Sequence, residues 1–321
     1  AGSGGLTCAV GFSKVGKKVL LVEREHMGGE CTNSGCVPSK ALLHAAKKGM
    51  KPGEAFTYVR NVVDNILAEE TPETFQNMGI DVVMGEAVFQ SKNSITVADA
   101  TYTFKTAVIA TGSSPRMIDI DGLDEKYILT NQNIFDLRDV PKKLLVIGGG
   151  PIGMEMAQAF VLLGSQVTIA ERGEQFARLE DKSVRPIIKK AFEDLGITIH
   201  TAAAIKHVEG NVAHFDHMHG EQTADSFSVE FDNVLIAIGR VPNIPSGLES
   251  AGIESTQYGV TVDKQQQTKN NRVYAVGDVA QRLKFTHMAD DIARQIVARV
   301  TSKGVLKINQ RKAVPKVTYT T

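Results

Sequence analysis

A glycine pattern that occurs twice in this chain of 321 residues constrains its fold more than any other feature. The complete copy starts with an apolar stretch at residues 144–147 and continues as Gly148-x-Gly150-x-x-Gly153. A helix is predicted next at residues 154–163, followed by a strand at 166–170. This order matches the dinucleotide-binding βαβ unit, whose glycines let backbone N–H groups approach a pyrophosphate at a helix N-terminus. The pattern predicts an α/β fold, and the alternative is a glycine-rich turn that only closes a βα unit.

The first copy becomes visible when the chain is shifted by 148 positions. Gly2, Gly5 and Glu23 then fall on Gly150, Gly153 and Glu171 of the complete copy. Each glutamate follows the middle glycine by 21 positions, where a ribose-binding carboxylate is expected. Two such units predict two dinucleotide sites in one chain. The alignment also predicts one strand and one glycine before residue 1, so we expect the chain to be a fragment of the full pattern.

The acidic residue of the second copy predicts which nicotinamide cofactor is bound. Glu171 would accept hydrogen bonds from ribose hydroxyls and repel a 2′-phosphate, so NAD(H) is favoured over NADP(H). Arg172 beside it weakens that preference because an arginine accommodates a 2′-phosphate.

A second constrained region contains two of the three cysteines. Cys31 and Cys36 lie in a glycine-rich loop that opens onto a helix predicted at residues 41–48, and Pro38 fits the first helical turn. The positive end of that helix stabilises a thiolate at Cys36. A structural zinc site needs four ligands, and only Cys8 remains. The pair is therefore interpreted either as two unrelated buried cysteines or as a redox-active disulfide.

The segment Gly-Gly-Glu-Cys-Thr-Asn-Ser-Gly-Cys-Val-Pro-Ser-Lys, residues 28–40, resembles the active-site segment of class I pyridine nucleotide-disulfide oxidoreductases. This family includes dihydrolipoamide dehydrogenase, glutathione reductase and mercuric reductase. Three further segments resemble its motifs: residues 111–115 (Thr-Gly-Ser-Ser-Pro), residues 234–243 with a second strand–glycine turn, and residues 268–278, which end in Gly-Asp. The resemblance covers nearly all of the chain.

The resemblance implies a flavoprotein that binds FAD and a nicotinamide cofactor. It implies that Cys36 faces the flavin as a charge-transfer thiolate, that Cys31 exchanges with the substrate, and that Lys40 pairs with Glu155 near flavin N5. The residues implied at the FAD site are Gly2, Ser3, Gly4, Gly5, Glu23, Arg24, Gly29, Glu30, Thr111, Gly112, Ser113, Gly277, Asp278, Met288 and Ala289. Those implied at the nicotinamide site are Gly148, Gly150, Pro151, Ile152, Gly153, Glu171, Arg172, Gly239 and Arg240.

The expected architecture is two Rossmann-like domains, the second inserted in the first. The FAD-binding domain comprises residues 1–115 and 246–313, and the NAD(P)-binding domain comprises 116–245. Residues 314–321 resemble the start of the family's interface domain, which carries the dimer contact and a His–Glu pair. We therefore expect a homodimer only for the full-length protein.

Helical material between residues 51 and 89, including a helix at 55–69, is expected to pack on the first domain. A further helix is predicted at 180–195. His214, His217 and His219 are interpreted as part of an exposed hairpin rather than as metal ligands, and no resident metal is expected. His287 is interpreted as a packing or flavin-edge residue rather than a base.

Composition narrows the partners. The chain carries 36 basic and 36 acidic residues, so its net charge suggests neither nucleic acid nor a charged membrane surface as a partner. No apolar run is long enough to span a bilayer. Three cysteines do not make a secreted disulfide framework, which favours a reducing, cytoplasmic compartment.

The resulting prediction is an NAD(P)H-dependent, FAD-containing reductase. It passes electrons through Cys31–Cys36 to a small-molecule or protein-bound disulfide or to a metal ion, or it runs in reverse to oxidise dihydrolipoamide. One alternative is a flavin diaphorase or NADH oxidase that bypasses the cysteines. Another is an inactive truncated fragment.

Overall fold

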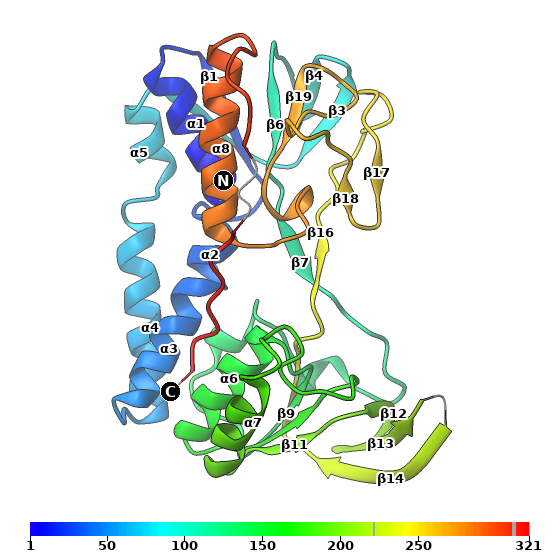
Figure 1. Cartoon of the computed structure of the whole chain (residues 1–321). Coiled ribbons are helices and arrows are strands. Elements are labelled where there is room, and N and C mark those ends of the chain that lie inside the picture. Colours follow the sequence, from blue (N-terminus) through cyan, green and yellow to red (C-terminus); the bar gives the residue numbers. More distant parts are fainter. Residues whose placement is uncertain (221, 310–312, 321) are drawn as a thin grey trace. The chain divides into compact units, whose positions relative to one another are not determined.

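The computed structural model describes residues 1–220, 222–309 and 313–320, and it has the α/β fold that the glycine patterns predict (Figure 1). The chain folds into two compact units. Unit 1 contains Ala1–Asn33, Asp64–Ser114 and Val241–Lys316, and unit 2 contains Ser34–Val63, Pro115–Arg240 and Val317–Thr321.

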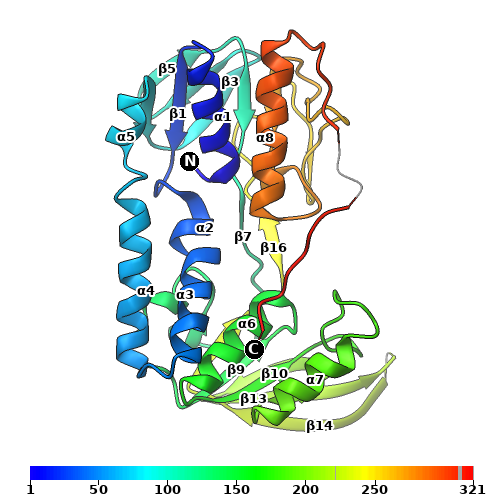
Figure 2. The same ribbon diagram turned by 60° about the vertical axis from the view of Figure 1, so that its left-hand side comes forward.

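Unit 1 is built on short parallel strand pairs that helices cover. Strand β1 (Val19–Glu23) pairs with β2 (Ile80–Met84), and β6 (Ala107–Ile109) pairs with β19 (Val273–Ala275). Helices α1 (Ser3–Lys14) and α8 (Thr286–Thr301) lie side by side, as Figures 1 and 2 show. This close approach needs glycine, because a Cβ on Gly11 of α1 would lie 2.9 Å from the Val297 side chain of α8.

The remaining elements of unit 1 are short. They are α2 (Gly29–Asn33), α5 (Pro72–Asn77), the 3-10 helix η3 (Gly277–Val279), the antiparallel sheet of β3 (Ala87–Ser91), β4 (Ser94–Val97) and β5 (Ala100–Thr103), and the pair β17 (Ser255–Thr256) and β18 (Gly259–Val260).

Unit 2 contains a five-stranded parallel sheet in the order β11-β10-β9-β15-β8. Its strands are β8 (Ile128–Leu129), β9 (Lys143–Ile147), β10 (Gln166–Ala170), β11 (Thr198–His200) and β15 (Asn233–Ile236). The helices are α3 (Cys36–Lys47), the start of α4 (Pro52–Leu67), α6 (Pro151–Leu162) and α7 (Arg185–Asp194), with 3-10 helices η1 (Glu125–Tyr127) and η2 (Ile134–Asp136). Strands β7 (Ser113–Pro115) and β16 (Arg240–Pro242) lie where the chain passes between the units.

Alternation along the central strand β9 explains the layers of unit 2 (Figure 2). Leu144 and Val146 belong to the apolar cluster that the helices form with the sheet. Leu145 and Ile147 point to the other face, where they pack with an antiparallel sheet of β12 (Ala203–Glu209), β13 (Val212–His219) and β14 (Gln222–Glu230). A strand that is buried on both faces reads as a continuous apolar run, as β9 does.

Some expectations from the sequence were wrong. The region expected to be helical between residues 51 and 89 contains strand β2 and the start of strand β3, which pair with strands far away or later in the chain. Helix α4 begins in unit 2 rather than packing wholly on the first domain, because Phe56 is fully buried there in an edge-to-face contact with Phe160, 6.2 Å between ring centroids. The helix predicted from residue 180 begins at Arg185. Pro186 follows in its first turn, the part of a helix where a missing N–H is tolerated.

The contact-based units differ from the predicted functional domains mainly at Ser34–Val63, which groups with unit 2. Helix α3 packs against α6, which accounts for this grouping. Residues 310–312 and 321, at the edges of the predicted domains, lie outside the described residues. Which cofactor belongs to which domain stays a prediction.

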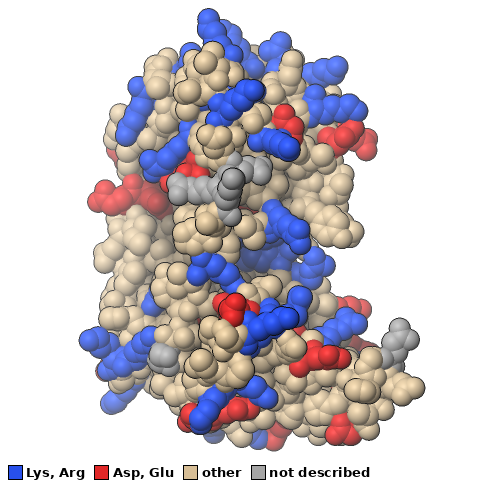
Figure 3. Space-filling model, viewed as in Figure 1, with Lys and Arg blue, Asp and Glu red and all other residues tan. Residues whose placement is uncertain are grey.

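Within the described ranges, no helix combines the length and apolar character needed to span a bilayer. Lys and Arg side chains are spread over the face that Figure 3 shows, with Asp and Glu side chains among them.

Candidate active site

The glycine loop of unit 2 is closed by the glutamate at the end of β10. Glu171 accepts hydrogen bonds from two backbone N–H groups, that of Gly149 at Oε2 and that of Gly173 at Oε1, both at 2.7 Å. The carboxylate thus fixes the loop between β9 and α6 and still has lone pairs available for a ribose hydroxyl.

The corresponding loop of unit 1 has the same arrangement. Glu23, at the end of β1, accepts at Oε2 from the N-terminal ammonium of Ala1, with which it forms an ion pair, and at Oε1 from the Glu25 N–H at 2.8 Å. These three residues are the counterparts of the preceding trio under the shift of 148 positions. The repeat therefore extends from the sequence to individual hydrogen bonds.

The glycines of the complete copy fit a bound pyrophosphate. Gly150 is the N-cap of α6, and a Cβ there would meet no atom within 4 Å, so space lies open at the helix N-terminus. By contrast, a Cβ on Gly153 would lie 2.0 Å from the carbonyl oxygen of Gly148. One glycine thus leaves room for a ligand, and the other permits the tight turn from strand to helix.

In unit 1, the N-terminus of α1 lies against the start of the cysteine segment. Gly2 is the N-cap of α1, and a Cβ on Gly29 would lie 2.3 Å from the Cα of Gly2. Gly29 also has a φ of 62°, a conformation that favours glycine. Two residues later, Cys31 lies half-buried in α2.

Cys36 is the first residue of α3, belongs to unit 2 and is exposed. Gly35 is the N-cap, and its carbonyl accepts from the Ser39 N–H at 3.1 Å. The backbone therefore confirms that Cys36 lies at a helix N-terminus. At that position unpaired N–H groups and the helix dipole favour an anionic sulfur.

One turn further along α3, Lys40 forms an ion pair with Glu155 of α6. The Nζ–Oε2 distance is 2.6 Å, and the side chains of Lys40 and Glu155 are 31% and 7% exposed. The other carboxylate oxygen accepts from the backbone N–H of Tyr319 at 3.1 Å, and the ring of Tyr319 lies 4.7 Å from the ammonium. The structure thus brings together the two charged residues that the resemblance pairs.

Two segments of unit 1 meet at Asp278 of η3. Ser113, which is buried, donates to its carboxylate at 2.5 Å. The loop before Ser113 is held by Asn243, which donates from its amide to the carbonyl of Thr111 at 3.0 Å and accepts from the Ser114 hydroxyl at 2.7 Å. Asn243 is a positioning residue that the sequence reasoning left out of the site.

A second omission is Asn131, a buried residue of unit 2. Its amide donates to the carbonyl of Ser34, just before the helix of Cys36, at 3.0 Å, and its oxygen accepts from Arg240 at 3.3 Å. No motif marks Asn131, because its role depends on contacts with residues about a hundred positions away on either side.

Five further predicted residues lie as follows, and helix α6 begins three residues earlier than the predicted start at residue 154. Met288 and Ala289 are buried on α8, Pro151 and Ile152 form the first turn of α6, and Arg24 is exposed in an ion pair with Glu25. His287 stacks on Phe285 with ring centroids 5.4 Å apart, which is a packing contact.

The histidines of the β12–β13–β14 sheet contact different residues. His217 stacks on Phe227 with ring centroids 4.3 Å apart, whereas His214 faces His207 and Glu209. Among the described residues, the group able to hold a metal ion is His207, Glu209 and His214 rather than the trio considered from the sequence.

Each unit has a glycine loop at a helix N-terminus that is held by a glutamate at the end of a strand, and Cys36 lies at a third helix N-terminus. This combination is typical of α/β dinucleotide-binding proteins with a thiol motif. The sequence profile of the pyridine nucleotide-disulphide oxidoreductases matches residues 1–293. The chain belongs to this family.

Relatives agree on the family and differ in activity. The chain is 32% identical to a mercuric reductase of Staphylococcus aureus, covering 99% of this chain and 62% of that protein. It is 36% identical to a dihydrolipoyl dehydrogenase of Bacillus subtilis, covering 90% of this chain and 66% of that protein. The solved structure of the HOCl-induced flavoprotein disulfide reductase RclA from Escherichia coli matches with a TM-score of 0.89 and 30% identity, over 99% of this chain and 73% of that one. The chain thus spans less than two thirds of the two curated relatives.

Proposed function

We propose that this chain carries the electron-transfer centre of an FAD-dependent oxidoreductase in which NAD(P)H reduces a Cys31–Cys36 disulfide. One NAD(P)H and one proton convert the disulfide into two thiols and leave NAD(P)⁺. Thiol–disulfide exchange then passes the electron pair to a substrate disulfide, which leaves as two thiols, and the reverse direction oxidises a dithiol such as dihydrolipoamide. Bound FAD would supply the two-electron relay between nicotinamide and sulfur.

The observation that carries this proposal is the bond between Lys40 and Glu155. It joins the helix that begins at Cys36 to the helix whose N-cap is Gly150. A single buried contact therefore ties the thiol motif to the dinucleotide fingerprint. Burial of the carboxylate at 7% exposure is typical of a positioning pair and not of a solvated surface pair.

Each residue of this group has a chemical task in the proposal. Cys36, at the helix N-terminus, is the thiolate that receives the electron pair, and Cys31 is the thiol that exchanges with substrate. Lys40 provides a fixed positive charge for negative charge that develops during reduction, and Glu155 holds the ammonium in place.

Glycine loops of both units support the two cofactor assignments. We propose FAD for the unit 1 loop at Gly2 and Glu23, with Ser113 and Asp278 as further polar contacts. NAD(H) is proposed for the unit 2 loop, and we favour it over NADP(H) because a carboxylate at the motif position of Glu171 would repel a 2′-phosphate.

The similar proteins support a broad class of substrates rather than one compound. A mercuric reductase and a dihydrolipoyl dehydrogenase are similar to this chain, so a disulfide and a metal ion are both proposed electron acceptors. A homodimer of the longer protein and a cytoplasmic location remain predictions of the same kind.

Thiol counting tests the proposal. The oxidised protein, supplied with FAD, is incubated anaerobically with NADH, and new thiols are titrated after the nucleotide is removed. Wild type and Cys8→Ser should each gain two thiols per chain, whereas Cys31→Ser and Cys36→Ser should gain none. NADH consumption with oxygen or a dye but without new thiols would favour a diaphorase that bypasses the cysteines.

A further inference from the structure

An irregularity in the antiparallel sheet of unit 2 places two histidines and a glutamate together. Strands β12 and β13 pair regularly up to Ile205 opposite Phe215, and pairing then resumes with His207 opposite His214. One extra residue, Lys206, is therefore inserted in β12 as a β-bulge.

The bulge decides which face His207 occupies. Continued regular pairing would set His207 opposite Ala213, on the face of the fully buried Ala213 and Phe215. With the bulge, His207 and Glu209 change to the face of His214, because a shift of one residue exchanges the two faces of a strand. Bulges that re-aim a side chain are frequent next to functional sites.

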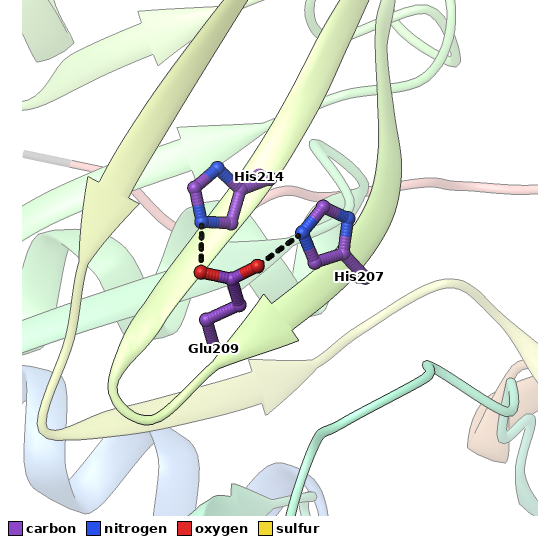
Figure 4. Close-up of side chains that lie close together, drawn as sticks. All are labelled: His207, Glu209 and His214. Carbon is purple, nitrogen blue, oxygen red and sulfur yellow. Dashed lines mark ion pairs between the residues drawn. The ribbon is translucent and has the colours of Figure 1, made fainter.

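The three side chains converge on one point, as Figure 4 shows. Nε2 of His207 lies 3.3 Å from Glu209 Oε1, and Nε2 of His214 lies 4.0 Å from Oε2 of the same carboxylate. The two rings are nearly parallel with centroids 4.6 Å apart, and one potential ligand atom from each residue lies within 4.8 Å of the others. The exposed fractions of His207, His214 and Glu209 are 40%, 35% and 73%, so the group is accessible to a solute ion.

Two neighbouring charged residues, Lys206 and Asp216, pair with each other. Asp216 accepts from Ser226 at 2.8 Å and from Thr223 at 3.3 Å, and it forms an ion pair with Lys206 at 3.0 Å. The bulge residue thus forms an ion pair with a further carboxylate of this sheet. Glu209 remains as the anionic ligand beside the two imidazoles.

We propose that His207, Glu209 and His214 form a binding site for a divalent transition-metal ion of the zinc, nickel and copper class. Imidazole is a preferred ligand of these ions, and two histidines with one carboxylate are a recurrent zinc ligand set. Tetrahedral bonds of about 2.0–2.1 Å place ligand atoms roughly 3.3 Å apart. Side-chain rotations that move the ligand atoms by about one ångström would bring them to this spacing, and water would complete the coordination of the metal ion.

The site is independent of the proposed redox centre, and its test removes the competing thiolates. The background protein carries Cys31→Ser and Cys36→Ser, and Zn²⁺ binding is measured by isothermal titration calorimetry. One Zn²⁺ per chain is expected. His207→Ala and His214→Ala should each weaken binding at least tenfold, and Glu209→Gln should weaken it to a smaller extent. The matched control is His219→Ala, an exposed histidine of the same strand, which should bind like the background.

Two results would overturn the site. One is no saturable Zn²⁺ binding by the folded background protein, and the other is unchanged affinity in His207→Ala or His214→Ala. Circular dichroism without metal checks that each variant folds. If a histidine variant does not fold, Cu²⁺ electron paramagnetic resonance of the background protein decides: nitrogen splitting from two imidazoles supports the site, and oxygen-only coordination contradicts it.

Discussion

The ion pair between Lys40 and Glu155 predicts an asymmetric response to mutation. Lys40→Met leaves a carboxylate that is 7% exposed and whose remaining hydrogen-bond partner, among the residues that the structure describes, is the Tyr319 N–H. Removing one partner of a buried pair costs about 3–5 kcal/mol, and because Lys40 is partly exposed to water we expect a loss at the lower end, about 3 kcal/mol. Glu155→Gln instead leaves an ammonium that is 31% exposed and turns to solvent. Its expected loss is that of one charge-assisted hydrogen bond, about 1.5 kcal/mol.

The double variant Lys40→Met/Glu155→Gln separates this account from simple loss of packing. It buries no unpaired charge, and the glutamine oxygen still accepts from Tyr319. It should therefore be more stable than Lys40→Met alone by about 1 kcal/mol or more. Urea unfolding at 25 °C, followed by circular dichroism, measures all four proteins. A Lys40→Met loss no larger than that of Glu155→Gln, or strictly additive losses, would refute the reasoning.

Three further predictions concern other parts of the chain. Burial raises the pKa of Cys8 to about 12, so iodoacetamide at pH 8 should leave Cys8 unmodified in the reduced native protein while it labels Cys36, as peptide mass spectrometry would show. Gly150→Ala should keep native stability but weaken NAD⁺ binding at least tenfold, because its Cβ enters open space at the helix N-terminus, whereas Gly153→Ala should unfold at lower temperature. Equal effects of the two glycine variants on stability would contradict this assignment. Burial lowers the pKa of His200 below its ordinary 6.5, and repulsion from the neighbouring His217 contributes to a smaller extent. The unfolded chain then binds more protons than the native one, so the stability contributed by neutral His200 is complete above pH 6.5 and declines on acidification. A His200→Gln variant should flatten that part of the stability–pH curve.

Local patterns were sufficient to predict the fold class and the family. The apolar run before Gly148 and the glycine spacing after it specify a strand, a turn and a helix within some twenty residues. The resemblance of the cysteine segment likewise depends on consecutive residues. Features of this kind depend on residues that are close together in the sequence, so they can be predicted without a structure.

Longer-range arrangements were not predictable. Strand β2 was hidden in a region read as helical, because its parallel pairing with β1 joins residues about sixty positions apart. Asn131 and Asn243 are ordinary loop residues in the sequence, and only the fold shows which carbonyls they bind. The group of His207, Glu209 and His214 depends on a bulge at Lys206, which no glycine, proline or asparagine in the sequence indicates. The sequence analysis therefore considered only His214, His217 and His219, and it interpreted them as part of an exposed hairpin.

An anaerobic NADH titration followed by visible absorption tests whether electrons from NADH reach Cys36. We expect the protein with bound FAD to develop a long-wavelength thiolate-to-flavin band after two electrons, and we expect Cys36→Ser to lack this band while it still binds the cofactor. Simple bleaching of the flavin in the wild type, identical to that in Cys36→Ser, would contradict the proposed electron transfer.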